Sequence, residues 1–503
     1  MRSKKAIINT VAGLSYELVA IVCAFILPRL ILQAFGSDYN GVTNSISQFL
    51  GYVTLLKAGI GGVTKAALYK PLADRDVKSI SGVVNATNQF LQKVSLIFLG
   101  TLFAFASLYP LLVKNNFDWL FTFSLVLIVG ISTFAQYFFG LTYQLLLYAD
   151  QRQGVISAVQ IVSTVLNTVV AALLINFGAG IHIVKLASSI VFCLNPLFIN
   201  FYARRYYKID KTVPPNKDAI KDRWDCFGLQ VANFINSNTD MLVLTIFTDV
   251  YIVSVYTVYH MVTSGIRQVL NTFVNGLGAA FGDMFAKEEI EIAKNNLLIF
   301  EQIVFCLANF FFSVCLVLIV PFVQVYTKNI NDVNYTRYAF AIVSTIAILF
   351  TCYRIPYQAI VEAAGHFKQT RNGAFFEAGL NIALSVIMVH KLGLVGVAIG
   401  TLAAAIFRTF QYCIYVSNNI VKRNIGILFK RLILSAVVFG LVYLFYNIIG
   451  FSEPENYLQW IVNAIPVSLF AGIVVMIIEV IFYRNTLRSS FSKIKGALKK
   501  GKQ

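Results

Sequence analysis

The sequence predicts an all-α integral membrane protein of about fourteen transmembrane helices, on the basis of its composition and the placement of its apolar residues. Of 503 residues, 58% are hydrophobic and 13% are charged. Soluble domains average about 45–50% apolar and about 25% charged residues. The apolar residues also fall in long runs, and one bilayer crossing needs about 20 mostly apolar residues. These observations exclude a soluble enzyme, a secreted protein and a nucleic-acid-binding domain.

Short polar turns separate the apolar runs. The predicted spans are 9–33, 42–64, 84–113, 119–148, 155–176, 183–203, 224–246, 250–282, 296–326, 338–361, 372–389, 394–417, 429–449 and 458–482. The longest connections, 204–223 and the tail 483–503, are too short for a soluble domain. The tail has apolar residues at helical spacing among lysines, which is typical of an amphipathic helix on the inner leaflet or of a disordered basic tail.

Lysine and arginine residues predict the orientation. If the N-terminus lies in the cytoplasm and the spans alternate, the cytoplasmic segments hold 30 Lys and Arg residues and the opposite side holds four. Short loops rich in Lys and Arg remain cytoplasmic, so both termini are predicted to be cytoplasmic. The net charge of +18 is spread over separate loops, which argues against a nucleic-acid groove.

An internal repeat relates the two halves of the chain. Residue types recur at an offset of 214 in Lys114-Asn115 and Lys328-Asn329, Tyr143-Gln144 and Tyr357-Gln358, Ala149 and Ala363, and Asn167 and Asn381. The offset predicts two parallel six-helix repeats, an arrangement that suits alternating access. The predicted parts are an N-terminal lobe 1–203, a cytoplasmic linker 204–223, a C-terminal lobe 224–417, two additional helices within 418–482, and the basic tail 483–503.

Charged residues inside the spans are the candidates for function. A charge at the bilayer centre costs about 2.5–3.5 kcal/mol on insertion scales, so it faces a cavity or a partner. The eight candidates are Glu17, Arg29, Lys57, Asp240, Arg267, Arg354, Glu377 and Arg408. Five of the eight are basic, which indicates an anionic ligand such as a phosphate.

We predict a cationic cavity that binds substrate through Arg29, Lys57, Arg267 and Arg354. Each of these residues has an alternative structural or interfacial role, and Arg408 could pair with an acid. Glu17, Asp240 and Glu377 are predicted to be counter-ions between helices or ion-coupling residues. No catalytic residue, metal ligand or cofactor is predicted, since the sequence has no Walker A, HExxH or CxxC motif.

Four motifs carry a resemblance to a known family. They are PRLILQAFG at 28–36, NSNTD at 236–240, GHFKQTR at 365–371 and GLVGVAIGT at 393–401. In their order among the spans they resemble bacterial polysaccharide repeat-unit flippases (Wzx type) of the multidrug/oligosaccharidyl-lipid/polysaccharide (MOP) superfamily. The family usually has Tyr-Gly where this chain has Tyr39-Asn40-Gly41.

The resemblance implies a flippase of undecaprenyl-pyrophosphate-linked oligosaccharides in the bacterial cytoplasmic (inner) membrane. Its implied partners are the lipid-linked oligosaccharide, membrane lipids, and the glycan polymerase and glycosyltransferases of the same pathway. Two alternatives stay open. A drug or cation antiporter of the same superfamily would favour an acidic cavity, whereas basic candidates here outnumber acidic ones. A membrane-bound glycan polymerase or ligase would need catalytic residues in the outer loops, which are short.

Overall fold

The structure is a computed structural model that describes residues 2–53, 58–112, 117–220, 238–274, 290–364 and 366–484. Almost all of these residues are helical, and they form two compact units. The first unit is Met1–Thr257 with Asn329–Val333, and the second is Val258–Lys328 with Asn334–Gln503. Each unit is described by itself below.

Eleven helical segments in the described residues are long and apolar enough to cross a membrane. They are Val11–Phe35, Val77–Leu111, Trp119–Ala149, Gln153–Asn176, Ile181–Tyr206, Glu291–Tyr326, Tyr338–Glu362, Gln369–Leu392, Leu394–Ile420, Gly426–Ile449 and Tyr457–Phe482. Each overlaps one of eleven predicted spans. The chain is therefore a multi-pass membrane protein.

The other three predicted spans, 42–64, 224–246 and 250–282, each include residues outside the described ranges. Their described parts are helical. They belong to α2 (Ser37–Val53), α3 (Ala58–Asp74), a short apolar helix Asn238–Phe247, and α10 (Val250–Val274). The predicted tail 483–503 lies outside the described residues from 485 onward.

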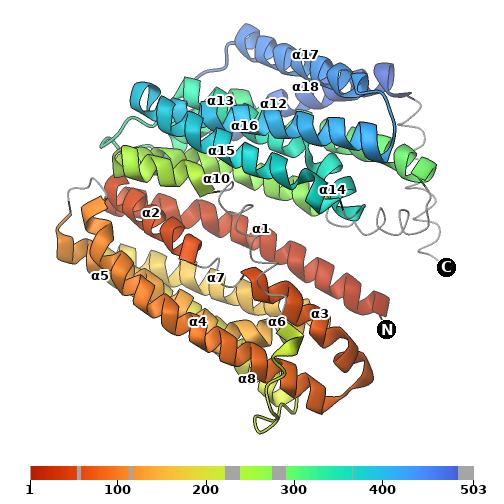
Figure 1. Ribbon diagram of the computed structural model, residues 1–503. Helices are drawn as coiled ribbons and strands as arrows, with labels where there is room; N and C mark the ends of the chain where they lie inside the picture. The colour runs from red at the N-terminus through yellow and green to blue at the C-terminus, as the bar shows by residue number, and fades with distance from the viewer. Residues whose placement is uncertain are drawn as a thin grey trace. The chain divides into compact units, whose positions relative to one another are not determined.

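In the first unit, long helices pack side by side (Figure 1). α1 (Arg2–Phe35) lies along α7 (Gln153–Asn176), and α7 packs on α8 (Ile181–Tyr206). α4 (Val77–Leu112) packs on α5 (Trp119–Ala135), which also contacts α8. The buried side chains between these helices are mainly aliphatic and aromatic, and lipid offers no hydrogen-bond partners at this depth.

The short segment 329–333 is part of the first unit, and its Asp332 side chain bonds the start of α2. Asp332 accepts hydrogen bonds from the Ser37 backbone N–H and the Ser37 hydroxyl, each at 2.6 Å, at the start of α2. A carboxylate is favourable at a helix N-terminus because free N–H groups and the helix dipole both attract negative charge. Gly36, just before it, has φ +95, which a side chain would strain.

In the second unit, α12 (Ile290–Tyr326) contacts α13 (Tyr338–Tyr353) and two C-terminal helices, α17 (Gly426–Ile449) and α18 (Tyr457–Phe482). Valine and alanine side chains such as Val442 fill this contact. Their small size lets the three helices approach closely. Van der Waals contacts then hold the helices together, because the hydrophobic effect does not act between helices in lipid.

The pair formed by α15 (Phe367–Leu392) and α16 (Leu394–Tyr415) brings backbone close to backbone at two glycines. A Cβ atom on Gly396 would lie 2.3 Å from the Met388 carbonyl oxygen. A Cβ atom on Gly400 would lie 2.3 Å from the Ser385 hydroxyl oxygen. The small-xxx-small pattern therefore sets the separation of these helices.

Two membrane helices are interrupted at corresponding places. In the first unit a π-helical turn, η2 (Gln136–Gly140), separates α5 from α6 (Leu141–Ala149). In the second unit the helix breaks at Arg354, between α13 and α14 (Ile355–Ala363). Pro356 contributes to that break because it has no backbone N–H to donate.

The bounds of the following helices differ by a constant number. α6 and α14 each have nine residues, and both ends are 214 residues apart. The first residues of α7 and α15, Gln153 and Phe367, are also 214 apart. This is the offset at which the residue types recur in the sequence.

Candidate functional site

A carboxylate shared by two arginines lies at the helix break of the second unit. Glu377 in α15 accepts from Arg354, at the junction of α13 and α14, with 2.5 Å between Oε1 and Nη1. Its other oxygen lies 3.4 Å from Arg408 Nε in α16. We call Arg354, Glu377 and Arg408 the Glu377 cluster. One negative and two positive charges leave it with a net charge of +1, in a region where charges are costly.

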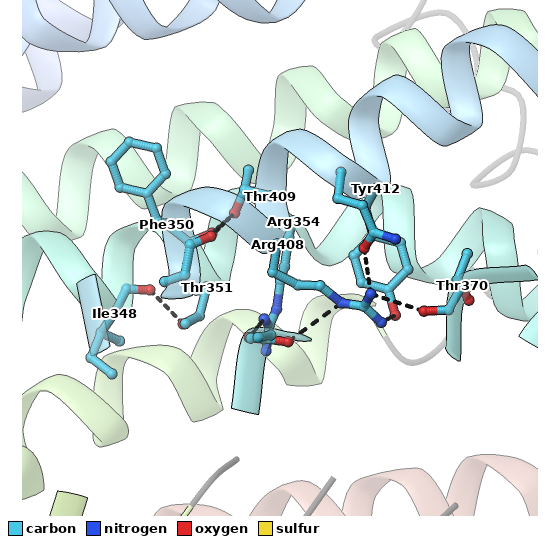
Figure 2. Close-up of polar contacts among 11 residues, drawn as sticks. Ile348, Phe350, Thr351, Arg354, Thr370, Arg408, Thr409 and Tyr412 are labelled. Atoms are coloured by element: carbon cyan, nitrogen blue, oxygen red, sulfur yellow. Dashed lines mark hydrogen bonds and ion pairs between the residues drawn. The ribbon is translucent and has the colours of Figure 1, made fainter. Parts of the chain in front are cut away.

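Arg408 is the more fully bonded of the two arginines (Figure 2). Its Nη1 donates to the Thr370 carbonyl oxygen at 3.0 Å and also to Gln411, and its Nη2 donates to the Tyr412 hydroxyl at 2.8 Å. The guanidinium carbon lies 4.0 Å from the centre of the Tyr412 ring, within cation–π range. The side chain of Arg354 keeps 18% exposure, against 5% for Arg408. The accessible positive charge of the cluster is therefore on Arg354.

The remaining predicted site residues are dispersed over several helices. Arg29 and Glu17 are both half-buried in α1, twelve residues apart, which is about 18 Å along a helix. Asp240 is half-buried in the helix Asn238–Phe247, and Arg267 is half-buried in α10. Lys57 lies outside the described residues. Of the predicted residues, the structure brings together Arg354, Glu377 and Arg408, and the pairing of Arg408 with an acid is confirmed.

A second buried ion cluster was missed by the sequence analysis. Glu301 in α12 accepts from both Nη atoms of Arg423, and its Oε2 lies 3.7 Å from Arg431 Nε in α17. In the same region Gln302 donates to Glu479 of α18 at 2.6 Å. We call these five residues the Glu301 cluster. Glu301 and Glu479 both lie inside predicted spans, so the search for charged residues within spans could have found them.

Arg423 lies between the spans of α16 and α17. Its side chain stays positively charged. Burial acts to lower the pKa of Arg423, but the hydrogen bonds and negative charge of Glu301 outweigh it, so the pKa is raised. Since arginine is charged at any physiological pH, the Glu301 cluster acts as a permanent ion pair. It joins α12 to the two C-terminal helices.

The first unit contains a small polar pocket with a volume of about 230 Å³. Four amide side chains line it, together with four hydroxyl side chains. They are Gln136, Gln144, Gln160, Asn195, Tyr16, Ser132, Thr133 and Thr164. Among the described residues that line it there is no Asp, Glu, Lys or Arg side chain. A search of the sequence for charges inside spans does not detect such a pocket.

Solved structures of membrane transporters share this fold. The lipid II flippase MurJ in an inward closed conformation matches with a TM-score of 0.74 at 15% identity, over 96% of this chain and 100% of the flippase. An inward-facing multidrug resistance MATE family transporter of the MOP superfamily matches with a TM-score of 0.63 at 17% identity, over 81% of this chain and 98% of that one.

A MOP superfamily transporter from Pyrococcus furiosus, described as having a binding pocket of reverse polarity, matches with a TM-score of 0.58 at 15% identity. That match covers 84% of this chain and 95% of the transporter. No protein-family model and no curated protein matches the sequence. The structural matches establish that the chain has the fold of MOP superfamily flippases and transporters.

Proposed function

We propose that the chain is a flippase that moves an undecaprenyl-pyrophosphate-linked oligosaccharide repeat unit across the bacterial cytoplasmic membrane. The observation that carries the proposal is the extent of the match to the lipid II flippase, which spans 96% of this chain and the whole of that one. The MATE transporter matches 81% of this chain. The match along nearly the whole of both chains supports the flippase proposal.

The proposed mechanism is alternating access by the two parallel lobes, 1–203 and 224–417, with the helices of 418–482 attached to the second. The constant offset between α6 and α14, and between the starts of α7 and α15, supports the repeat. The distribution of Lys and Arg supports cytoplasmic termini. The glycan polymerase and glycosyltransferases of the same pathway are the proposed partners.

The proposed anion-binding residues are Arg29, Lys57, Arg267 and Arg354, which would hold the pyrophosphate. The first three supply positive charge from separate segments. Arg354 is already paired with Glu377, so its share rests on the excess charge of the Glu377 cluster and on its remaining exposure. Glu17 and Asp240 remain proposed ion-coupling residues, whereas Glu377 serves the two arginines as a counter-ion.

The test is a flipping assay in proteoliposomes with a fluorescent polyprenyl-pyrophosphate oligosaccharide whose outer-leaflet fraction is chemically quenched. We expect protein-dependent exchange between leaflets. Arg29→Ala and Arg267→Ala should each slow it by about tenfold or more, as loss of a charged hydrogen bond predicts. Lys391→Ala, at the end of α15, is the matched control and should flip like wild type.

The competing function is antiport of a cationic drug, which the MATE match favours. The same vesicles distinguish the two functions if they are loaded with a fluorescent cationic dye and a proton gradient is imposed. Gradient-driven dye efflux without exchange of the lipid-linked oligosaccharide would overturn the flippase proposal. Equal flipping by wild type and both arginine variants would overturn the anion site.

A further inference from the structure

The polar pocket of the first unit is built by the backbone. At η2 the chain makes π-helical hydrogen bonds, which widen the helix by one residue and often mark functional sites. A Cβ atom on Gly140, the last residue of η2, would lie 2.3 Å from Pro196 Cβ, so α8 approaches at this wall. Pro196 also removes the helical hydrogen bond to the Phe192 carbonyl, and Phe192 lines the pocket.

The amide groups around this pocket retain their hydrogen-bonding capacity. Within the described part of the chain, no protein group hydrogen-bonds the side-chain amides of Gln136, Gln160 and Asn195. All three residues lie in membrane spans. An amide without a partner costs about 2–7 kcal/mol in an apolar medium. The amides are therefore satisfied by what fills the pocket.

The chemistry of the wall specifies a neutral ligand. An ion bound inside a membrane needs opposite charge, and the pocket wall supplies none. Each amide both donates and accepts, and each hydroxyl does the same. Such groups match vicinal hydroxyls, which also donate and accept. Tyr16 and Phe192 add aromatic rings to the wall, and aromatic faces suit the C–H face of a sugar.

The pocket has room for one sugar ring. A volume of about 230 Å³ corresponds to about seven or eight waters at about 30 Å³ each, and a single sugar ring fills a similar space. We propose that this pocket is a subsite for one neutral sugar ring of the transported glycan. The proposal rests on the proposed flippase function and extends it, because it separates recognition of the sugar from recognition of the pyrophosphate.

The first experiment measures sugar binding apart from transport. Saturation-transfer difference NMR is recorded on the full-length protein in detergent, with glucose, galactose, mannose, rhamnose and N-acetylglucosamine, and with glucuronate as a charged counterpart. We expect at least one neutral sugar to show saturation transfer. Gln160→Leu and Asn195→Leu should each weaken that binding by about fivefold, as loss of one hydrogen bond predicts. Gln358→Leu, which removes a half-buried amide of α14 in the second unit, should bind like wild type.

Thermal unfolding of the same variants separates a binding role from a structural one. Because Gln160 and Asn195 have no described protein partner, their leucine variants should unfold at or above the wild-type temperature. Lowered unfolding temperatures would make the amides structural and overturn the subsite. Binding of none of the neutral sugars, tighter binding of glucuronate, or sugar binding unchanged in both variants would also overturn it.

The two proposals fail in distinguishable ways. Arg267→Ala should slow flipping in proteoliposomes by about tenfold or more while leaving saturation transfer from the neutral sugar intact. If the wild-type protein binds the sugar but flips no lipid-linked oligosaccharide, the flippase proposal fails and the sugar site stands as a separate finding. If flipping proceeds normally in Gln160→Leu and Asn195→Leu and no neutral sugar binds, the subsite fails and the flippase proposal stands.

Discussion

The polar pocket of the first unit and the Glu377 cluster of the second each lie beside an interrupted helix, and their side chains differ in chemistry. Gly140, at the pocket wall, is 214 residues before Arg354, and each precedes a nine-residue helix. Asn195 in the pocket is 214 residues before Thr409, which donates to the Phe350 carbonyl at 2.9 Å (Figure 2). One position holds open neutral amides, and the other holds charges and hydroxyls that are already bonded.

The difference shows that a broken membrane helix provides space, and that side chains decide how the space is used. A guanidinium or a carboxylate inside a bilayer must find a partner, so Arg354, Glu377 and Arg408 draw α14, α15 and α16 together. Neutral amides cost less to leave open, and they keep a cavity available. We therefore expect the second unit to be rigid at this position and the first to be receptive.

The largest effect should come from Glu377→Gln. This change leaves the buried Arg408 and the half-buried Arg354 without their counter-ion, and breaking a buried ion pair costs about 3–5 kcal/mol. The free energy of unfolding is measured in detergent by denaturant titration. Glu362→Gln is the control, because Glu362 is exposed and bonds only its helix neighbour Gln358 among the contacts described. An equal loss in both variants would contradict a structural role for the cluster.

A smaller loss is expected for Gly140→Ala in the first unit. The added methyl group meets Pro196, and overpacking of this kind costs about 1–3 kcal/mol. The midpoint of thermal unfolding should fall, and the neutral-sugar signal should weaken because the pocket wall moves. Gly100→Ala in α4 is the matched control, because a Cβ atom there would have no neighbour within 4 Å. It should be neutral or more stable by up to about 1 kcal/mol.

The smallest effect should follow Thr409→Val. The change keeps the shape but removes the hydroxyl, which lies 2.9 Å from the Phe350 carbonyl oxygen of another helix and 2.8 Å from the Ala405 carbonyl oxygen of its own helix, at a cost of about 0.5–1.5 kcal/mol. Thr351→Val removes only a bond within its own helix, to Ile348, and should stay within about 0.5 kcal/mol of wild type. Differential scanning fluorimetry of both variants suffices, and indistinguishable midpoints would show that the bond between helices contributes nothing.

The spans could be predicted from the sequence because a span is a run of consecutive apolar residues, which a local hydropathy average detects. The eleven candidate spans follow the predicted ones, and the 214-residue offset reappears in helix bounds. Pairings across the chain were harder. Glu301 and Arg423 are 122 residues apart, and nothing local in either segment identifies the other. The pocket was missed for a different reason: Gln160 and Asn195 are uncharged, and the sequence was searched for charged residues inside the spans.

The Glu301 cluster has a consequence for biosynthesis. Glu301 enters the membrane with α12, while Arg431 and Glu479 arrive with α17 and α18, which are made more than a hundred residues later. Until those helices are inserted, Glu301 lacks the full set of partners that it has in the finished protein. The contacts of the Glu301 cluster are therefore complete only after α17 and α18 have been inserted. A chain that stops before α17 would hold the Glu301–Arg423 ion pair but would lack the contacts of Arg431 and Glu479 that fix α12 against the C-terminal helices.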